Sequence, residues 1–396
     1  MKAMAPSPEQ PDVCAAVEIE RIRKAVRATR ETLLANLAII GEIPAPTFRE
    51  DDRIQFLRDR FTECGLVDIS VDEVGNGFGV LRGTDDTRHL LALAHTDTAF
   101  PATVDHAATI LPESVTGPGV GDNSLGVALL ATLPDLLGHL EIVPRANWIL
   151  MGGVRSLGRG DLGGLRFFLD NTDLAIEGAV AVEGVQLGRL SYSSIAMLRG
   201  EIACETPAEY DWTRLGAVGA IRTLCEVVRR IDAIRRPNQP QSTIVFGSIE
   251  GGQSYNRVAT RSRLRFEIRS EADDLADEIA ADIQSIVEEV ASETGARLRL
   301  DVFARRRSGG IAFGHPLVRF VRDTMSALAI EPRIAPSTSE LAALIEHDVP
   351  AVTLGLTHGE NLHMMDECIF LEPLERGVTQ VLATLLALDR GVCDEG

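Results

Sequence analysis

The most constraining feature of this 396-residue chain is an apolar run that ends in a histidine and an aspartate, Leu90-Leu-Ala-Leu-Ala-His95-Thr-Asp97. Five successive apolar residues bounded by polar ones are typical of a strand that is buried on both faces of a sheet. At the carboxyl end of such a strand, His95 reaches a crevice and the carboxylate of Asp97 can hold its second ring nitrogen. A His-x-Asp pair alone is common by chance, so its meaning depends on the segments that follow.

Three further candidate ligands follow predicted strands or loops. Asp122 comes after a glycine-rich segment and opens an apolar helix, Glu183 ends a second buried strand, and His363 lies just beyond the last one. In an open α/β sheet, groups at the carboxyl ends of the strands converge on one crevice. Mixed imidazole and carboxylate ligands suit zinc, manganese or cobalt. The sequence therefore predicts a metal site that contains His95 and these three residues.

Composition limits the classes of partner. The formal net charge of −19 argues against nucleic acid or an anionic membrane surface. No apolar run reaches the length of a membrane span, and the first residues lack the apolar core of a signal peptide. The six cysteines are scattered without a Cys-x-x-Cys, which is typical of reduced thiols. We expect a cytoplasmic protein that acts on a small molecule.

The order of predicted strands and helices indicates an interrupted α/β domain. Strands and helices alternate up to residue 187, and the alternation returns after residue 305. Residues 188–305 instead contain several strands and two long amphipathic helices, which favours a separate α+β insert. The predicted domains are thus residues 1–187 and 306–396, which together form one α/β sheet, and the insert at 188–305.

Over residues 30–390, the chain resembles the metallopeptidase family of aminoacylase, acetylornithine deacetylase, succinyl-diaminopimelate desuccinylase, carboxypeptidase G and peptidase T. Seven segments in the family's order carry the resemblance: His95-Thr-Asp97, Gly117-Pro-Gly-Val-Gly-Asp122-Asn, Gly160-Asp-Leu-Gly-Gly164, Val182-Glu183-Gly, Gly251-Gly-Gln-Ser-Tyr-Asn256, Ile268-Arg269-Ser270, and Glu360-Asn-Leu-His363 with Glu367. The resemblance implies a zinc-exopeptidase-like catalytic domain with an inserted lid domain that dimerises.

The same resemblance implies roles for the candidate ligands. His95 and Glu183 would hold one metal ion, Asp122 would bridge towards a second ion, and His363 would hold that second ion. Asp97 would orient His95.

On the lid, the resemblance implies that Asn256 and Arg269 face the substrate, often across a dimer interface. The guanidinium of Arg269 suits a carboxylate. We therefore expect a substrate that bears a carboxylate and a homodimer or higher homo-oligomer.

Departures from the family pattern matter as much as the matches. Relatives carry two consecutive glutamates, a general base and a ligand of the second metal, where this chain has Ser156 and Leu157. Neither side chain can take those roles. Tyr210 stands where relatives carry a histidine that polarises the scissile carbonyl, and its hydroxyl could still donate a hydrogen bond. We expect one divalent transition metal per chain, whether manganese, zinc or cobalt.

These departures favour a metal-dependent hydrolase of a carbon–nitrogen bond that has moved away from peptide cleavage. The resemblance then extends to aminohydrolases that displace an amine from an activated aromatic ring, such as that of 5-nitroanthranilate. Asp97, Glu360 and Glu340 are candidates for the missing base. One alternative is an amidase or dipeptidase of the same family. Another is a catalytically inactive homologue that acts by binding.

Overall fold

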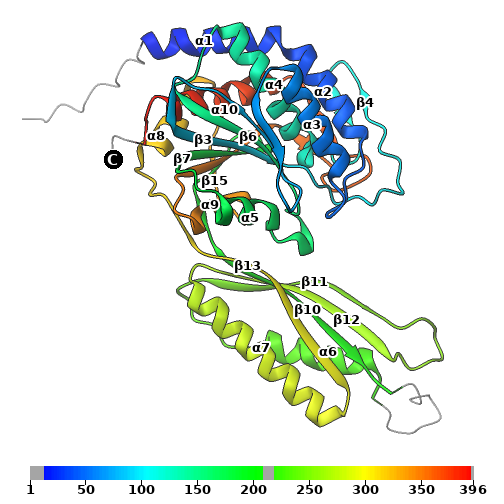
Figure 1. The fold of residues 1–396 in the computed structure, drawn as a ribbon. Helices are drawn as coiled ribbons and strands as arrows, with labels where there is room; N and C mark the ends of the chain where they lie inside the picture. The colour runs from blue at the N-terminus through cyan, green and yellow to red at the C-terminus, as the bar shows by residue number, and fades with distance from the viewer. Residues whose placement is uncertain (1–12, 208–217, 394–396) are drawn as a thin grey trace, which may run out of the picture. The chain divides into compact units, whose positions relative to one another are not determined.

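The structure is a computed structural model that describes residues 13–207 and 218–393. The chain forms two compact units (Figure 1). The first unit comprises residues up to Tyr192 together with Ile311–Ala335 and the chain from His347 onward, and the second comprises Ser193–Gly310 and Pro336–Glu346. Residues 336–346, which lie within the predicted range 306–396, belong to the second of these units.

The first unit is built on one eight-stranded sheet. In spatial order its strands are β1 (Val67–Val71), β2 (Gly77–Leu81), β6 (Ala146–Gly153), β3 (Asp85–His95), β7 (Ile176–Val185), β16 (Ala351–Thr357), β8 (Arg189–Ser191) and β15 (Arg333–Ile334). The central strands β6, β3, β7 and β16 run parallel to one another. Their carboxyl ends therefore meet at one edge of the sheet, as an open α/β sheet requires for a site.

Strand β3 is buried on both of its faces. Every residue from Leu90 to Ala94 is almost fully buried, and Leu90, Ala92 and Ala94 belong to the same apolar core as the helices. Seven helices pack in this unit: α1 (Val13–Ala28), α2 (Arg30–Glu42), α3 (Asp51–Glu63), α4 (Leu125–Leu140), α5 (Gly163–Asn171), α8 (Pro316–Ala327) and α10 (Leu374–Asp389). The buried strand predicted from the apolar run is thus present and central.

Two sets of contacts join the C-terminal part of this unit to its N-terminal part. The carboxylate of Asp389, at the end of α10, accepts hydrogen bonds from the backbone N–H groups of Arg145 and Ala146 and from the indole of Trp148. A small four-stranded sheet joins β17 (Gly359–Glu360) and β18 (Cys368–Phe370) to β5 (Ser114–Thr116) and β4 (Thr109–Ile110). This small sheet brings the loop before α4 close to the loop that carries His363.

The second unit is an α+β domain. Its four-stranded antiparallel sheet has the order β11 (Ser242–Gly251), β12 (Arg261–Ser270), β10 (Ala196–Glu205) and β13 (Arg297–Arg306), and helices α6 (Ala220–Asp232) and α7 (Asp273–Thr294) pack on it. The short elements β9 (Ser193–Ser194), β14 (Gly309–Gly310) and α9 (Glu340–Glu346) complete the unit. The predicted fold class, an α/β catalytic domain with an α+β insert, is confirmed. Among the described residues, no helix is long and apolar enough to cross a membrane.

Candidate metal centre

His95 is the last residue of strand β3, and Asp97 contacts one of its two ring nitrogens. Its Nδ1 atom lies 3.0 Å from the backbone oxygen of Asp97 and 3.3 Å from the Oδ1 atom of the same residue. Only 4% of the His95 side chain is exposed. Because Nδ1 is engaged by Asp97, the Nε2 atom is the one available to a ligand, as in metal sites where a carboxylate orients the imidazole.

Asp97 is itself fixed by a buried hydrogen-bond network. Its Oδ2 atom accepts hydrogen bonds of 2.8 Å from the hydroxyl of Thr47 and from the backbone N–H of Leu157. Burial opposes ionisation of this carboxyl, but the hydrogen bond and charge of His95 hold the pKa of Asp97 below its usual value. A fully buried, ionised and doubly anchored carboxylate fits the orienting role that the resemblance implied for Asp97.

Asp122 lies in an irregular helical turn, Val120–Ser124, that precedes α4. Its Oδ1 atom is 3.0 Å from the Nε2 atom of His95, and its Oδ2 atom is 3.3 Å from the Nδ1 atom of His363. Burial opposes ionisation of Asp122, but the hydrogen bond with His95 and the charges of His95, His363 and Arg189 hold the pKa of Asp122 below its usual value. Asp122 therefore faces both histidines with different oxygens.

Two side chains shape this turn. Glu367 is fully buried, and its Oε1 atom accepts hydrogen bonds from the backbone N–H groups of Gly121 and Asp122 at 2.7 and 2.9 Å. The Oε2 atom of Glu367 accepts one from the backbone N–H of His363 at 3.0 Å. The side chain of Asn123 bonds the backbone at both Val182 and Gly184, which flank Glu183. The sequence assigned no role to Glu367 or Asn123, because their partners are distant along the chain.

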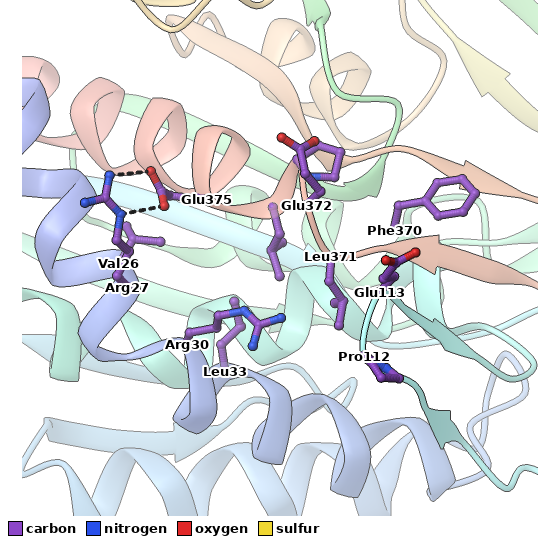
Figure 2. A pocket seen from close by; sticks show the side chains of 12 residues that line it. Val26, Arg27, Arg30, Leu33, Pro112, Glu113, Phe370, Leu371, Glu372 and Glu375 are labelled. Atoms are coloured by element: carbon purple, nitrogen blue, oxygen red, sulfur yellow. Dashed lines mark hydrogen bonds and ion pairs between the residues drawn. The ribbon is translucent and has the colours of Figure 1, made fainter.

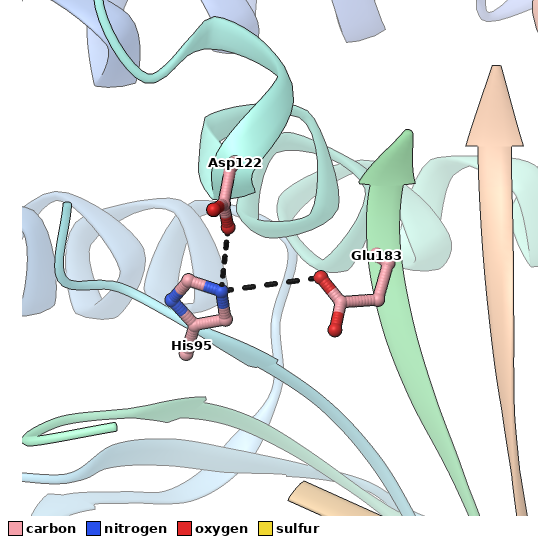
Figure 3. A group of neighbouring side chains, drawn as sticks. All are labelled: His95, Asp122 and Glu183. Carbon is pink, nitrogen blue, oxygen red and sulfur yellow. Dashed lines mark ion pairs between the residues drawn. The ribbon is translucent and has the colours of Figure 1, made fainter. Parts of the chain in front are cut away.

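Glu183, near the end of β7, completes a trio with His95 and Asp122 (Figure 3). Its Oε2 atom lies 4.0 Å from the Nε2 atom of His95. One ligand atom from each of the three residues lies within 4.8 Å of the others, and no further group of this kind occurs in the described part of the chain. One imidazole nitrogen and two carboxylate oxygens form a donor set that suits manganese, zinc or cobalt.

His363 does not belong to this compact trio. About 60% of its side chain is exposed, and its contact with the centre is the one to Asp122. The segment with Ser156 and Leu157 does lie at the centre, because the N–H of Leu157 bonds Asp97. Ser156 is buried there and Leu157 is half-buried. The residues at the two positions where the resemblance implies carboxylates are thus a serine and a leucine.

The predicted lid residues belong to the second unit. Arg269 is exposed on β12, and its Nε atom lies 2.6 Å from a carboxylate oxygen of Glu267. Asn256 accepts a hydrogen bond from the hydroxyl of Ser254. Tyr210 falls outside the described residues. The roles assigned to these three residues remain predictions.

A surface cavity of about 670 Å³ lies away from the trio, between α1, α2 and the segment that joins β18 to α10 (Figure 2). Its floor is apolar, with Leu33 and Leu371 among the lining residues. The guanidinium of Arg27 is held by the carboxylate of Glu375 at 2.7 Å. No residue of the trio lines this cavity, and we assign it no part in the chemistry.

Comparisons with known proteins agree with this geometry. Residues 215–295 match the family model of the peptidase dimerisation domain. The chain has the fold of the M20 metallopeptidases. A tripeptidase from Staphylococcus aureus superposes with a TM-score of 0.73 at 19% identity, over 91% of this chain and 98% of that one. A dipeptidase from Saccharomyces cerevisiae superposes with a TM-score of 0.79 at 11% identity, over 95% and 99% of the chains.

A third similar structure is a dinuclear metal-binding peptidase of the M20 family from Bacillus subtilis. It superposes with a TM-score of 0.61 at 14% identity, over 91% of this chain and 98% of that one. No curated protein matches the sequence. The family resemblance predicted from the sequence is thereby confirmed, and identities this low establish the fold alone.

Proposed function

We propose that this protein is a metal-dependent hydrolase of a carbon–nitrogen bond that works with a single metal ion and releases an amine from an activated aromatic amino acid, of the kind of 5-nitroanthranilate. One observation carries the proposal. The trio of His95, Asp122 and Glu183 is complete, whereas the neighbouring segment offers only Ser156 and Leu157.

The donor set of the trio fits a divalent transition metal, which when bound supplies Lewis-acid activation of water near neutral pH. The residues of the chain then have separate tasks. His95 would bind through Nε2 because Asp97 engages its Nδ1 atom. Asp122 and Glu183 would bind through the oxygens that face His95.

The missing general base decides which reactions remain accessible. Asp97 is a poor proton acceptor, because it is fully buried and its Oδ2 atom is already bonded twice. Glu360 is exposed on β17, near His363 in the sequence, and Glu340 is buried in the second unit. Electron-withdrawing groups on an aromatic ring make the addition of water to that ring easier, and such a reaction relies less on a strong, well-placed base.

An amidase or dipeptidase is the second candidate, and the similarity to a tripeptidase and a dipeptidase favours it. Arg269 would suit the carboxylate of either kind of substrate. An inactive binding homologue is less favoured, because three side chains of metal-ligand type lie close enough together to hold one ion. The match to a dimerisation domain supports a homodimer or higher homo-oligomer, which light scattering on the purified protein would test.

The deciding experiment measures metal content and reaction products together. Protein stripped with a chelator is reloaded with manganese, zinc or cobalt, and the bound metal is counted per chain. The reloaded protein is then incubated with amino-substituted aromatic acids, dipeptides and N-acyl amino acids. We expect one metal per chain and ammonia released from an aromatic acid, and we expect a Glu183→Gln control to lose both.

Two other outcomes would change the assignment. Two metals per chain with peptide turnover would establish the amidase or dipeptidase. If the protein is folded but binds no metal, the inactive binding homologue is the one candidate function that remains.

A further inference from the structure

A cation lies directly against the metal trio. The Nη1 atom of Arg189 is 3.4 Å from the Oε1 atom of Glu183, and the Arg189 side chain is only 20% exposed. Arg189 is not a ligand, because a guanidinium has no lone pair to offer. Its charge nevertheless acts on the same carboxylates that would bind a metal ion.

The position of Arg189 is fixed by the backbone. It begins β8, and its N–H bonds the carbonyl of Gln186 at 2.8 Å across a tight turn. Within this turn Gly188 has a φ of 93°, and a Cβ atom there would come within 2.4 Å of the carbonyl oxygen of Glu331. The N–H of Arg333 also bonds the carbonyl of Gly188 at 2.7 Å. The turn therefore returns the chain so that Arg189 lies over the end of β7.

The contact makes the two oxygens of Glu183 different. Oε1 faces the guanidinium of Arg189, whereas Oε2 faces the Nε2 atom of His95. The guanidinium on Oε1 competes with a metal ion for that oxygen and favours Oε2 as the oxygen that Glu183 offers. A fixed positive charge next to the site also repels an incoming divalent cation.

We propose that Arg189 is a positioning residue that keeps Glu183 a one-oxygen ligand and weakens the hold of the trio on its divalent cation. This inference rests on the proposed metal-dependent function and adds a control of metal affinity to it. The metal is then exchangeable, because the chain places a competing cation of its own beside the ligand.

The test is a titration of metal-free protein with Mn²⁺ by isothermal calorimetry. Changing Arg189→Met removes the charge beside Glu183, and we expect Mn²⁺ to bind about ten-fold more tightly or better, because the fixed charge that opposes the incoming cation is gone. Arg189→Lys keeps the charge but loses the planar fork, and its affinity should fall between the two. The electron paramagnetic resonance spectrum of bound Mn²⁺ should also differ between the wild-type protein and the Arg189→Met variant, because Glu183 would bind through both oxygens in the variant.

The matched control is Arg82→Met, which removes an exposed arginine paired with Asp68 and Asp86 and should leave Mn²⁺ binding unchanged. Thermal unfolding without metal shows whether each variant is folded. If Arg189→Met does not fold, Arg189→Gln takes its place, because an amide keeps a hydrogen bond to Glu183 without the charge.

The outcomes separate the two proposals. If the wild-type protein binds one metal and the Arg189 variants bind it equally or more weakly, the role of Arg189 is overturned and the proposed function stands. If only the variants bind metal, Arg189 is confirmed as the competitor and the proposed function of the wild-type chain fails. If neither form binds metal, both proposals fail.

Discussion

The two sides of Asp122 are built very differently. Its Oδ1 atom faces His95, whose side chain is 4% exposed and is oriented by a buried aspartate. Its Oδ2 atom faces His363, whose side chain is 60% exposed. On the first side Glu183 supplies a further carboxylate, whereas no further ligand group of the described residues joins His363 on the second side.

This difference shows that the two sides of Asp122 are held in place by different contacts. On the first side each ligand is tied to an orienting partner, so the loss of one residue disturbs the others. On the second side Glu367 holds the His363 loop through the backbone, so the loop keeps its place whatever side chains surround it. The first side thus has three ligand groups close together, and the second side has only the pair of Asp122 and His363.

The largest effect should come from the first side. Changing His95→Ala removes the one nitrogen ligand of the trio, and we expect metal binding to fall by more than the roughly 100-fold that outer partners of a ligand contribute. Calorimetric titration with Mn²⁺ measures the loss. His139→Ala, which removes an exposed histidine on α4, is the control and should bind metal normally. Full binding by the His95 variant would show that the metal sits elsewhere.

The next effect comes from rebuilding the second side. The double change Ser156→Glu with Leu157→Glu restores two carboxylates beside Asp122 and His363, and we expect the number of metal ions per chain to rise from one to two. Metal analysis after dialysis measures this number. The control has glutamine at both positions, because glutamine is nearly the same size as glutamate but carries no charge. This control should still bind one metal ion per chain. A count that stays at one for both double variants would mean that the segment does not reach the second site.

A smaller effect should follow at the residue that joins the two sides. Glu367→Gln keeps the size of the side chain but replaces one acceptor oxygen with an amide N–H group, which would face backbone N–H donors. We expect the free energy of unfolding to fall by about 1–3 kcal/mol. Urea unfolding measures it, and the exposed Glu372→Gln serves as the control. Unchanged stability would argue that the two loops keep their places without Glu367.

The smallest effect should come from His363. Changing His363→Ala should leave one metal per chain and alter its affinity little, because the trio does not include this residue. Metal analysis of wild type and variant side by side provides the comparison. A wild-type count of two that drops to one in the variant would contradict the single-metal centre.

Much of the fold could be predicted from local patterns. The apolar run before His95 predicted a buried strand, and β3 is that strand with both faces covered. The trio could be anticipated because parallel strands bring their carboxyl ends to one edge, which holds for β3 and β7. The short strand β15 carries too few residues for a periodic pattern, and it was not predicted.

The parts that escaped prediction depend on contacts across long distances in the sequence. Glu367 bonds the backbone of Gly121, which is 246 residues away. Arg189 contacts Glu183 only because a tight turn folds the chain back. Likewise, the packing of residues 336–346 with the second unit depends on tertiary contacts that no local pattern encodes.

The strand order also has a consequence for how the protein is made. Strand β16 lies between β7 and β8, although some 160 residues separate it from β8 along the chain. A growing polypeptide on the ribosome would present β3, β6 and β7 long before β16 and α10 emerge. Until then one side of β7, next to Glu183, has no neighbouring strand. The strand beside Glu183 and the Glu367 side chain that holds the Asp122 turn are therefore made late, and ribosome-bound chains that stop before residue 351 should bind metal more weakly than the whole chain.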